Sequence, residues 1–127
     1  MASEHIYKQF DSDLEAIRAK VLEMGTLVEE QTANAVQSLL NTDIKLAEAV
    51  MKRDAQINDL EVVIDEETSL LIAKRSPAAG DLRNIMMMLK IITDLERMGD
   101  EAAKIARSTT RIFEDNRMSK PRFTEIK

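Results

Sequence analysis

Three long segments of the sequence repeat apolar residues at alternating steps of three and four, and only two short breaks separate them. Such spacing places the apolar residues on one face of a helix. Short connections make consecutive helices antiparallel. We therefore predict an all-α fold, an antiparallel up-down-up three-helix bundle with long helices. The first helix should run from about His5 to Leu40, with an apolar face made of Phe10, Leu14, Ile17, Val21, Met24, Val28 and Ala35.

The two breaks carry residues that begin and end helices. Asn41-Thr42-Asp43 offers side-chain oxygens to the free amides of a second helix, expected from about Asp43 to Arg75. Serine and proline then follow at Ser76-Pro77, where we expect the serine to cap a third helix and the proline to occupy its first turn. The third helix should end near Asn116. Residues 1–117 are thus predicted to form the bundle, and residues 118–127, which lack periodicity, a tail or a linker toward an absent second bundle.

Composition excludes several classes of function. A net charge of −5 argues against nucleic-acid binding, because a phosphate backbone attracts a basic surface. The absence of cysteine removes thiolate metal sites and favours a reducing compartment, here the cytoplasm. No apolar run is long enough to cross a membrane, so we expect a protein that is not membrane-embedded.

Carboxylates interrupt the apolar face of the third segment. That face reads Leu82, Ile85, Leu89, Ile92, Glu96, Gly99, Ala103 and Ala106. Glu96 takes a core position, and the small neighbours Gly99 and Ala103 leave space beside it. Asp100 follows Glu96 by one helical turn. A carboxylate in such a position requires a proton, a basic residue or a cation to compensate its charge.

The second segment has the same anomaly, since Asp54 and Glu61 interrupt a face otherwise made of Ala47, Val50, Ile57, Ile64, Thr68 and Leu71. A chain reversal near Pro77 would bring Asp100 level with Asp54, and Glu96 level with Asn58, to within about one helical turn. We predict a cluster of Asp54, Asn58, Glu96 and Asp100. Oxygen ligands of this kind select Mg²⁺, Mn²⁺, Ca²⁺ or Fe³⁺. The alternative, equally weighted, is that the acids are solvated and paired with Arg53, Lys90, Arg97 and Lys104.

Two further patterns lie on the third segment. Basic residues recur every seven positions, and pairing with acids four residues on, as in Lys90 with Asp94, explains this row better than a phosphate-binding surface does. The row is Arg83, Lys90, Arg97, Lys104 and Arg111. Three consecutive methionines, Met86 to Met88, cannot all face inward, so at least one should reach a surface that a second bundle could cover.

Two stretches resemble the PhoU family, whose members are accessory regulators of bacterial phosphate transport. They are Pro77-Ala78-Ala79-Gly80-Asp81-Leu82-Arg83 and Asp94-Leu95-Glu96-Arg97-Met98-Gly99-Asp100-Glu101-Ala102, supported by Lys52-Arg53-Asp54 and Ile64-Asp65-Glu66-Glu67. The resemblance implies a three-helix bundle with an E-x-x-x-D motif, which in some members binds iron, manganese, magnesium or zinc. These metal ligands carry over to Glu96 and Asp100.

The resemblance also implies a function. It predicts a phosphate-signalling adaptor between a sensor histidine kinase and the phosphate ABC transporter, which negatively regulates the phosphate-starvation response and phosphate uptake without catalysis. PhoU proteins usually carry two bundles, whereas this sequence has one, so we expect either a fragment or a homodimer. Two alternatives stay open: a metal-carboxylate enzyme, which the lack of histidine ligands disfavours, and a purely structural helical module.

Overall fold

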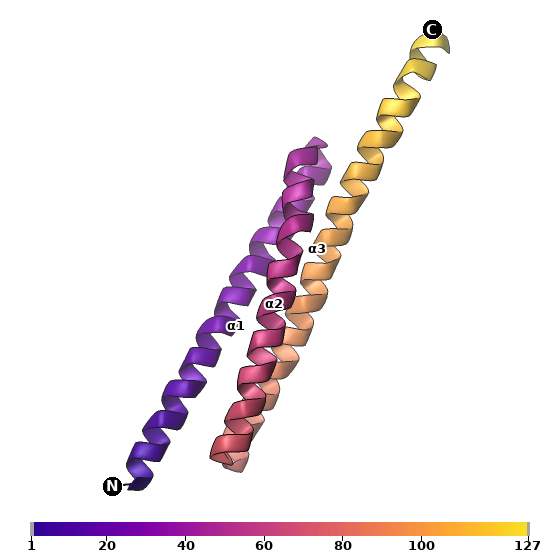
Figure 1. The fold of residues 1–127 in the computed structure, drawn as a ribbon. Coiled ribbons are helices and arrows are strands. Elements are labelled where there is room, and N and C mark those ends of the chain that lie inside the picture. The colour runs from indigo at the N-terminus through magenta and orange to yellow at the C-terminus, as the bar shows by residue number, and fades with distance from the viewer. Residues whose placement is uncertain (1, 127) are drawn as a thin grey trace.

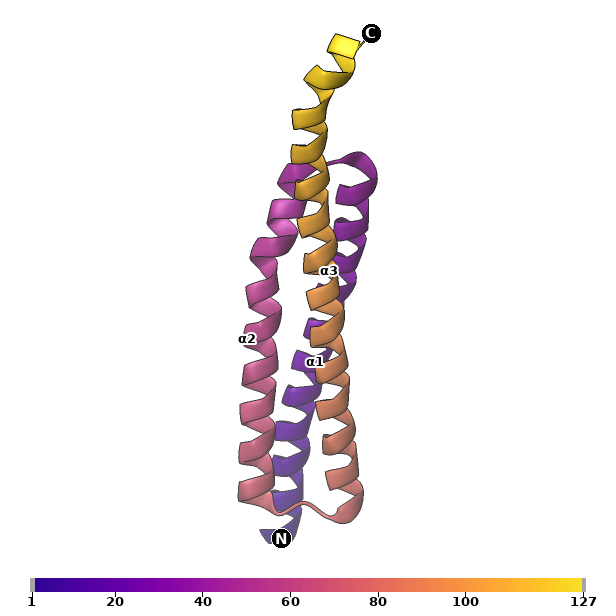
Figure 2. The same cartoon turned by 90° about the vertical axis from the view of Figure 1, so that its right-hand side faces the viewer.

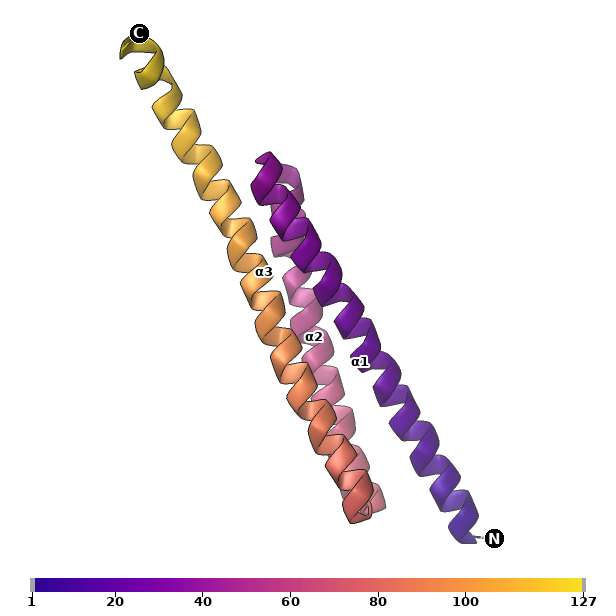
Figure 3. The same cartoon turned by 180° about the vertical axis from the view of Figure 1, so that it is seen from behind.

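The computed structural model describes the backbone of residues 2–126 and the side chains of residues 8–117. It contains α1 (Ala2–Asn41), α2 (Ile44–Arg75) and α3 (Ala79–Ile126), and no strand among the described residues. The helices run up, down and up, and each contacts the other two (Figure 1). Seen from behind, they form the same side-by-side bundle (Figure 3). The predicted all-α three-helix bundle is therefore confirmed.

The turn between α1 and α2 follows the predicted capping chemistry. The Asp43 carboxylate accepts a hydrogen bond from the Leu46 amide at 3.1 Å, which satisfies one of the free amides at the start of α2. The Asp43 amide in turn donates to the carbonyl of Ser38 at 2.9 Å. Thr42 lies between them with a φ of 49°, a left-handed conformation that reverses the chain.

The turn between α2 and α3 differs from the prediction. Ser76 ends α2 instead of starting α3: it adopts φ 42° and ψ 63°, and its amide donates to the Ile72 carbonyl. The helix stops there because the residue before a proline is disfavoured in the right-handed helical region. Helix α3 begins two residues after Pro77, and its first turn closes through the Leu82 amide and the Ala78 carbonyl at 2.9 Å.

The end of α3 also differs. The helix continues to Ile126, past the predicted end near Asn116 and through Pro121. Figures 1 and 2 show this last part extending beyond the turn between α1 and α2. A missing apolar stripe indicates only that a segment has no face to bury, and it does not exclude a helical backbone. Whether residues 118–127 link to a second bundle stays a prediction.

The core has two unequal parts. Large side chains fill the part near the α2–α3 turn, including Phe10, Met24, Ile57 and Ile85. Near the α1–α2 turn the core is built of small residues, namely Ala35, Ala47, Val50, Ala102 and Ala106. Small side chains let helix backbones approach one another closely. A membrane-crossing stretch is absent from the described residues, since none of the three helices combines the required length with the required apolar character.

The predicted apolar faces of α1 and α2 are largely confirmed, and that of α3 is confirmed at five of eight positions: Ile85, Ile92, Gly99, Ala103 and Ala106. Leu82 remains 38% exposed, and Leu89 is only partly buried. The buried positions of α3 instead include some that the sequence analysis missed: Met88, Ala102 and Thr109. Glu96 consequently lies beside the buried seam of α3, half-buried, and not in a core position.

Candidate functional site

The acidic residues singled out in the sequence lie along the groove between α2 and α3. Asp54 and Glu61 interrupt the buried face of α2, as predicted, and both are half-buried. On α3, Glu96 and Asp100 are half-buried too, whereas Asn58 of α2 is exposed. Four carboxylates therefore face a shared groove, while the one amide of the predicted cluster points into solvent.

Gly99 fixes the register between the two helices. A β-carbon placed on Gly99 would lie 3.7 Å from the Asp54 carboxylate, so Asp54 is level with the Gly99-Asp100 turn of α3. Burial raises the pKa of Asp54 above its ordinary range, and the nearby Asp100 charge raises it further, while Arg107 lowers it. The predicted proximity of Asp54 and Asp100 is thus confirmed.

The reflection about Pro77 predicted Glu96 level with Asn58 to within about a turn, and the charge of Glu96 acts on Glu61, three residues from Asn58. Burial raises the pKa of Glu61, and the charge of Glu96 and then that of Asp65 raise it further. Glu96 therefore lies close to Glu61, which is about one turn along α2 from Asn58. Electrostatic repulsion thus acts between Asp54 and Asp100 and between Glu61 and Glu96, at two levels along α2 and α3.

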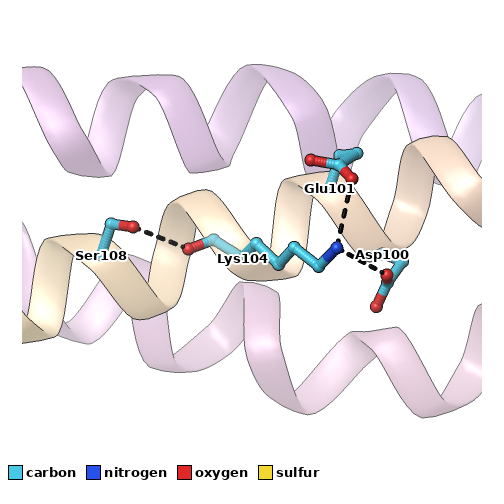
Figure 4. Close-up of polar contacts among 4 residues, drawn as sticks. All are labelled: Asp100, Glu101, Lys104 and Ser108. Atoms are coloured by element: carbon cyan, nitrogen blue, oxygen red, sulfur yellow. Dashed lines mark hydrogen bonds and ion pairs between the residues drawn. The ribbon is translucent and has the colours of Figure 1, made fainter.

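Lys104 compensates part of this negative charge. Its Nζ atom lies 3.4 Å from Asp100 and 3.3 Å from Glu101, both on its own helix (Figure 4). The hydrogen bond to Glu101, and then that to Asp100, raise the pKa of Lys104. The expected pairing of acids with surface bases is therefore confirmed for Lys104.

The other bases behave differently. Arg53 pairs with Glu30 of α1, at 3.7 Å, and not with the acidic residues of the α2–α3 groove. Within residues 8–117, neither Lys90 nor Arg97 makes an ion pair. The members of the basic row on α3 are exposed, so most of that row faces solvent.

The donor set of the groove consists of carboxylate oxygens, which suit hard cations. Among the described side chains, however, no group of three or more histidine, cysteine, aspartate or glutamate residues is placed to hold a metal ion. The side chain of His5, the one histidine of the sequence, lies outside residues 8–117. The predicted ligation of a metal by Asp54, Asn58, Glu96 and Asp100 therefore stays a prediction.

A second polar groove, which was not predicted from the sequence, lies between α1 and α2. Ion pairs cross it from Lys20 to Glu67 and from Arg75 to Asp13, the latter at 3.6 Å. These residues line a hollow of about 290 Å³. A signal was present in the sequence, since Asp13 and Lys20 are seven residues apart, as are Glu67 and Lys74, and such spacing aligns charges along one edge of a helix.

The fold and the groove define a class: long three-helix bundles with paired acids along the junction of the second and third helices. A family model described as the PhoU domain matches residues 21–109 of this chain. The chain belongs to the PhoU family, as the two sequence motifs predicted.

Curated relatives agree with this assignment. A phosphate-specific transport system accessory protein PhoU homolog from Burkholderia sp is 50% identical over 112 residues, which cover 88% of this chain and 48% of the relative. The phosphate-specific transport system accessory protein PhoU of Escherichia coli (strain K12) is 44% identical over 111 residues, 87% of this chain and 46% of the relative. The chain thus spans about half the length of the curated relatives it matches.

Solved structures show the same fold. The crystal structure of PhoU from Pseudomonas aeruginosa superimposes with a TM-score of 0.82 at 46% identity, covering 84% of this chain and 51% of that one. The phosphate transport system regulatory protein PhoU from Streptococcus pneumoniae gives a TM-score of 0.75 at 33% identity, covering 80% of this chain and 48% of that one.

Proposed function

We propose that this protein is a phosphate-signalling adaptor that acts on a phosphate transport system by binding other proteins. The observation that carries the proposal is the match of residues 21–109 to the PhoU domain, together with relatives named as phosphate-specific transport system accessory proteins. The bundle suits such a role, since its long helices present wide faces to partners. The site of action under this proposal is the cytoplasm.

The partners in this proposal are a sensor histidine kinase and the phosphate ABC transporter. The adaptor negatively regulates the phosphate-starvation response and phosphate uptake when phosphate is plentiful. Deleting the gene in its own host should switch on a phosphate-starvation reporter at high phosphate, and expression of this chain should restore repression. Unchanged reporter activity in the deletion strain would overturn the regulatory role.

Metal binding is a second proposal, and it centres on Asp54 and Asp100. Burial and then the Asp100 charge raise the pKa of Asp54, and a hard cation between these carboxylates would relieve the repulsion between them. Mg²⁺ or Mn²⁺ suits such a two-carboxylate site, because both ions keep several water ligands, and Glu96 and the exposed Asn58 would join as donors only after their side chains rearrange. Iron and zinc are the other metals that the family resemblance suggests.

Calorimetric titration of Mn²⁺, Mg²⁺, Zn²⁺ and Fe³⁺ tests this second proposal. Binding should be lost in an Asp54→Asn/Asp100→Asn variant and retained in Asp59→Asn, which alters an exposed aspartate of the same helix. Equal binding by all three proteins would place any metal elsewhere. Oxygen consumption by an iron-loaded sample tests the alternative of a metal-carboxylate enzyme.

Self-association is a third proposal. Four apolar residues recur every seven positions on α3: Ile91, Met98 and Ile112 are 41%, 52% and 42% exposed, and Ile105 is partly buried. At about 100° per residue, these positions lie on the flank of the α3 seam opposite Glu96 and Asp100. An exposed apolar row of this kind suits an interface in a homodimer.

A further inference from the structure

Arg75, in the last turn of α2, is the least satisfied polar residue of the α1–α2 groove. Its side chain is 28% exposed, and its Nε atom is buried without a hydrogen-bond partner. Among the side chains that the structure describes, the one charged group paired with it is Asp13, whose Oδ2 atom lies 3.6 Å from Nη2, too far for a hydrogen bond. A largely buried guanidinium therefore donates no hydrogen bond to any side chain of residues 8–117, although it carries five N–H groups.

Charged and apolar side chains both line the hollow around Arg75. Lys20, Lys74 and Arg75 supply three positive charges at its lining, against the two carboxylates of Asp13 and Glu67. The Glu67 carboxylate is already engaged by Lys20, which leaves Lys74 and Arg75 as the less compensated charges. The apolar part of the lining comes from Ile17, Leu70 and Leu71.

The size of the hollow limits what it can hold. About 290 Å³ is just below the range for small-molecule sites, roughly 300–1,000 Å³. An oxyanion alone would leave the apolar wall uncovered, and Leu70 is still 55% exposed. A ligand that fits has one anionic head and one short apolar body.

We infer that the α1–α2 groove binds a small organic oxyanion, a phosphate monoester or a carboxylate with a compact apolar substituent. The anionic oxygens accept hydrogen bonds from the terminal N–H groups of Arg75, and a turn of the side chain toward the ligand brings the now buried, unpartnered Nε–H into the two-pronged geometry that guanidinium favours. Lys74 adds a second positive charge. The apolar substituent covers Leu70 and Leu71. Binding at this groove does not require that the protein act in phosphate transport.

Arg53 provides a matched control on the same helix. Like Arg75 it pairs with a carboxylate of α1 at long range, 3.7 Å from Glu30, but it does not line the hollow. Substituting Arg53 therefore removes a comparable ion pair between the same two helices. Any change specific to Arg75 variants reflects the groove and not the loss of an α1–α2 ion pair.

The experiment is an NMR titration that follows the Arg75 Nε–H signal with phenyl phosphate, phenylacetate and inorganic phosphate as probes. We expect saturable shifts with the two organic probes and weaker ones with inorganic phosphate, since only the former cover the apolar wall. Binding of inorganic phosphate alone would contradict the role of Leu70 and Leu71. Shifts at neither Arg75 nor Lys74 with any probe would overturn the site.

Three variants separate binding from folding. Arg75→Lys keeps the charge but removes the Nε–H, and it should weaken phenyl phosphate binding at least about tenfold, whereas Arg53→Lys should not change it. Asp13→Asn removes the competing carboxylate and should strengthen binding several-fold. A role of Arg75 limited to stabilising the bundle predicts that Asp13→Asn leaves binding unchanged, and that result would overturn the inference.

Discussion

Gly99 of α3 lies against Ile57 of α2 with little room for a side chain: a β-carbon on Gly99 would be 3.2 Å from Ile57 Cδ1 and 3.4 Å from Ile57 Cγ2. Alanine is favoured over glycine inside a helix by about 1 kcal/mol, but the contact with Ile57 opposes that gain. We expect Gly99→Ala to leave the free energy of unfolding nearly unchanged and Gly99→Leu to lower it by roughly 1–3 kcal/mol. Urea unfolding followed by circular dichroism measures both.

Gly25 is the control, because a β-carbon there meets nothing within 4 Å. Gly25→Ala should raise the free energy of unfolding by about 0.5–1 kcal/mol. Ile57→Val removes Cδ1. In that background, Gly99→Ala should raise the free energy of unfolding by the helix-propensity difference between alanine and glycine. A large stabilisation by Gly99→Ala alone would contradict the close approach of α2 and α3.

The raised pKa of Asp54 predicts a pH dependence. The folded protein binds a proton at Asp54 more tightly than the unfolded chain does. Protonation of Asp54 therefore adds to the stability of the folded protein, and this contribution is lost as pH rises through the folded-state pKa. Asp54→Asn should therefore stabilise the protein at neutral pH, by less than about 1 kcal/mol because solvent screens a half-exposed charge. The gain should vanish at acidic pH, where aspartate is protonated in both states.

Unfolding of the wild type and of Asp54→Asn across the pH range tests this dependence. Asp59→Asn, at an exposed position of the same helix, should show no comparable gain at neutral pH. A destabilising Asp54→Asn at neutral pH would mean that the carboxylate makes a favourable interaction, for instance with a bound cation. Repeating the measurement with a chelator separates that case.

Periodicity in the sequence located the three helices and part of their register, but it placed the end of α3 too early. Periodicity located the buried faces of α1 and α2, since apolar side chains recur there with little interruption. Reflection about Pro77 brought Asp54 level with Asp100, because an antiparallel pair joined by a short turn has only one register near that turn. Asp54 and Asp100 lie at the predicted level even though Ser76 ends α2 instead of capping α3.

Two features required the three-dimensional structure. The seam of α3 contains alanines on adjacent positions, Ala102 and Ala103, and both are buried, so a hydrophobicity pattern could not tell which flank Glu96 occupies. The burial of Arg75 and its unpartnered Nε–H could not be predicted from the sequence either. Its burial results from the approach of α1 to the last turn of α2, and no local pattern reports which donors remain unpaired after that approach.

Gln31 is a buried polar residue that contacts the part of the core built of small residues. Its side-chain amide donates to the Val50 carbonyl at 2.6 Å, but its Oε1 atom is buried without a partner. The Val50 carbonyl lies inside α2, so it keeps its helical hydrogen bond when the glutamine is replaced. Gln31→Met should therefore raise the free energy of unfolding by about 1 kcal/mol, because an unsatisfied acceptor is removed at similar volume.

Ser38 provides the comparison for Gln31. Its hydroxyl donates to the Ala35 carbonyl at 2.7 Å and lies 3.1 Å from the Thr109 hydroxyl, so this buried group is satisfied. Ser38→Ala leaves Thr109 with the Ile105 carbonyl at 3.2 Å, and we expect a change within about 1 kcal/mol. Thermal unfolding ranks the variants, and a destabilising Gln31→Met would indicate that water or another partner satisfies Oε1.

The exposed apolar row of α3 predicts the outcome of a dimerisation assay. If Ile91, Met98 and Ile112 form the interface of a homodimer, Met98→Lys should abolish the dimer at micromolar concentrations, because a lysine charge would be buried without a partner. Helix content should not change, since Met98 is 52% exposed in the single chain. Sedimentation velocity distinguishes monomer from dimer. Leu22→Lys, at a position of α1 that is 72% exposed, should leave the dimer intact. A monomeric wild type would contradict self-association through this row, and equal loss of the dimer in both variants would place the interface across α1 as well.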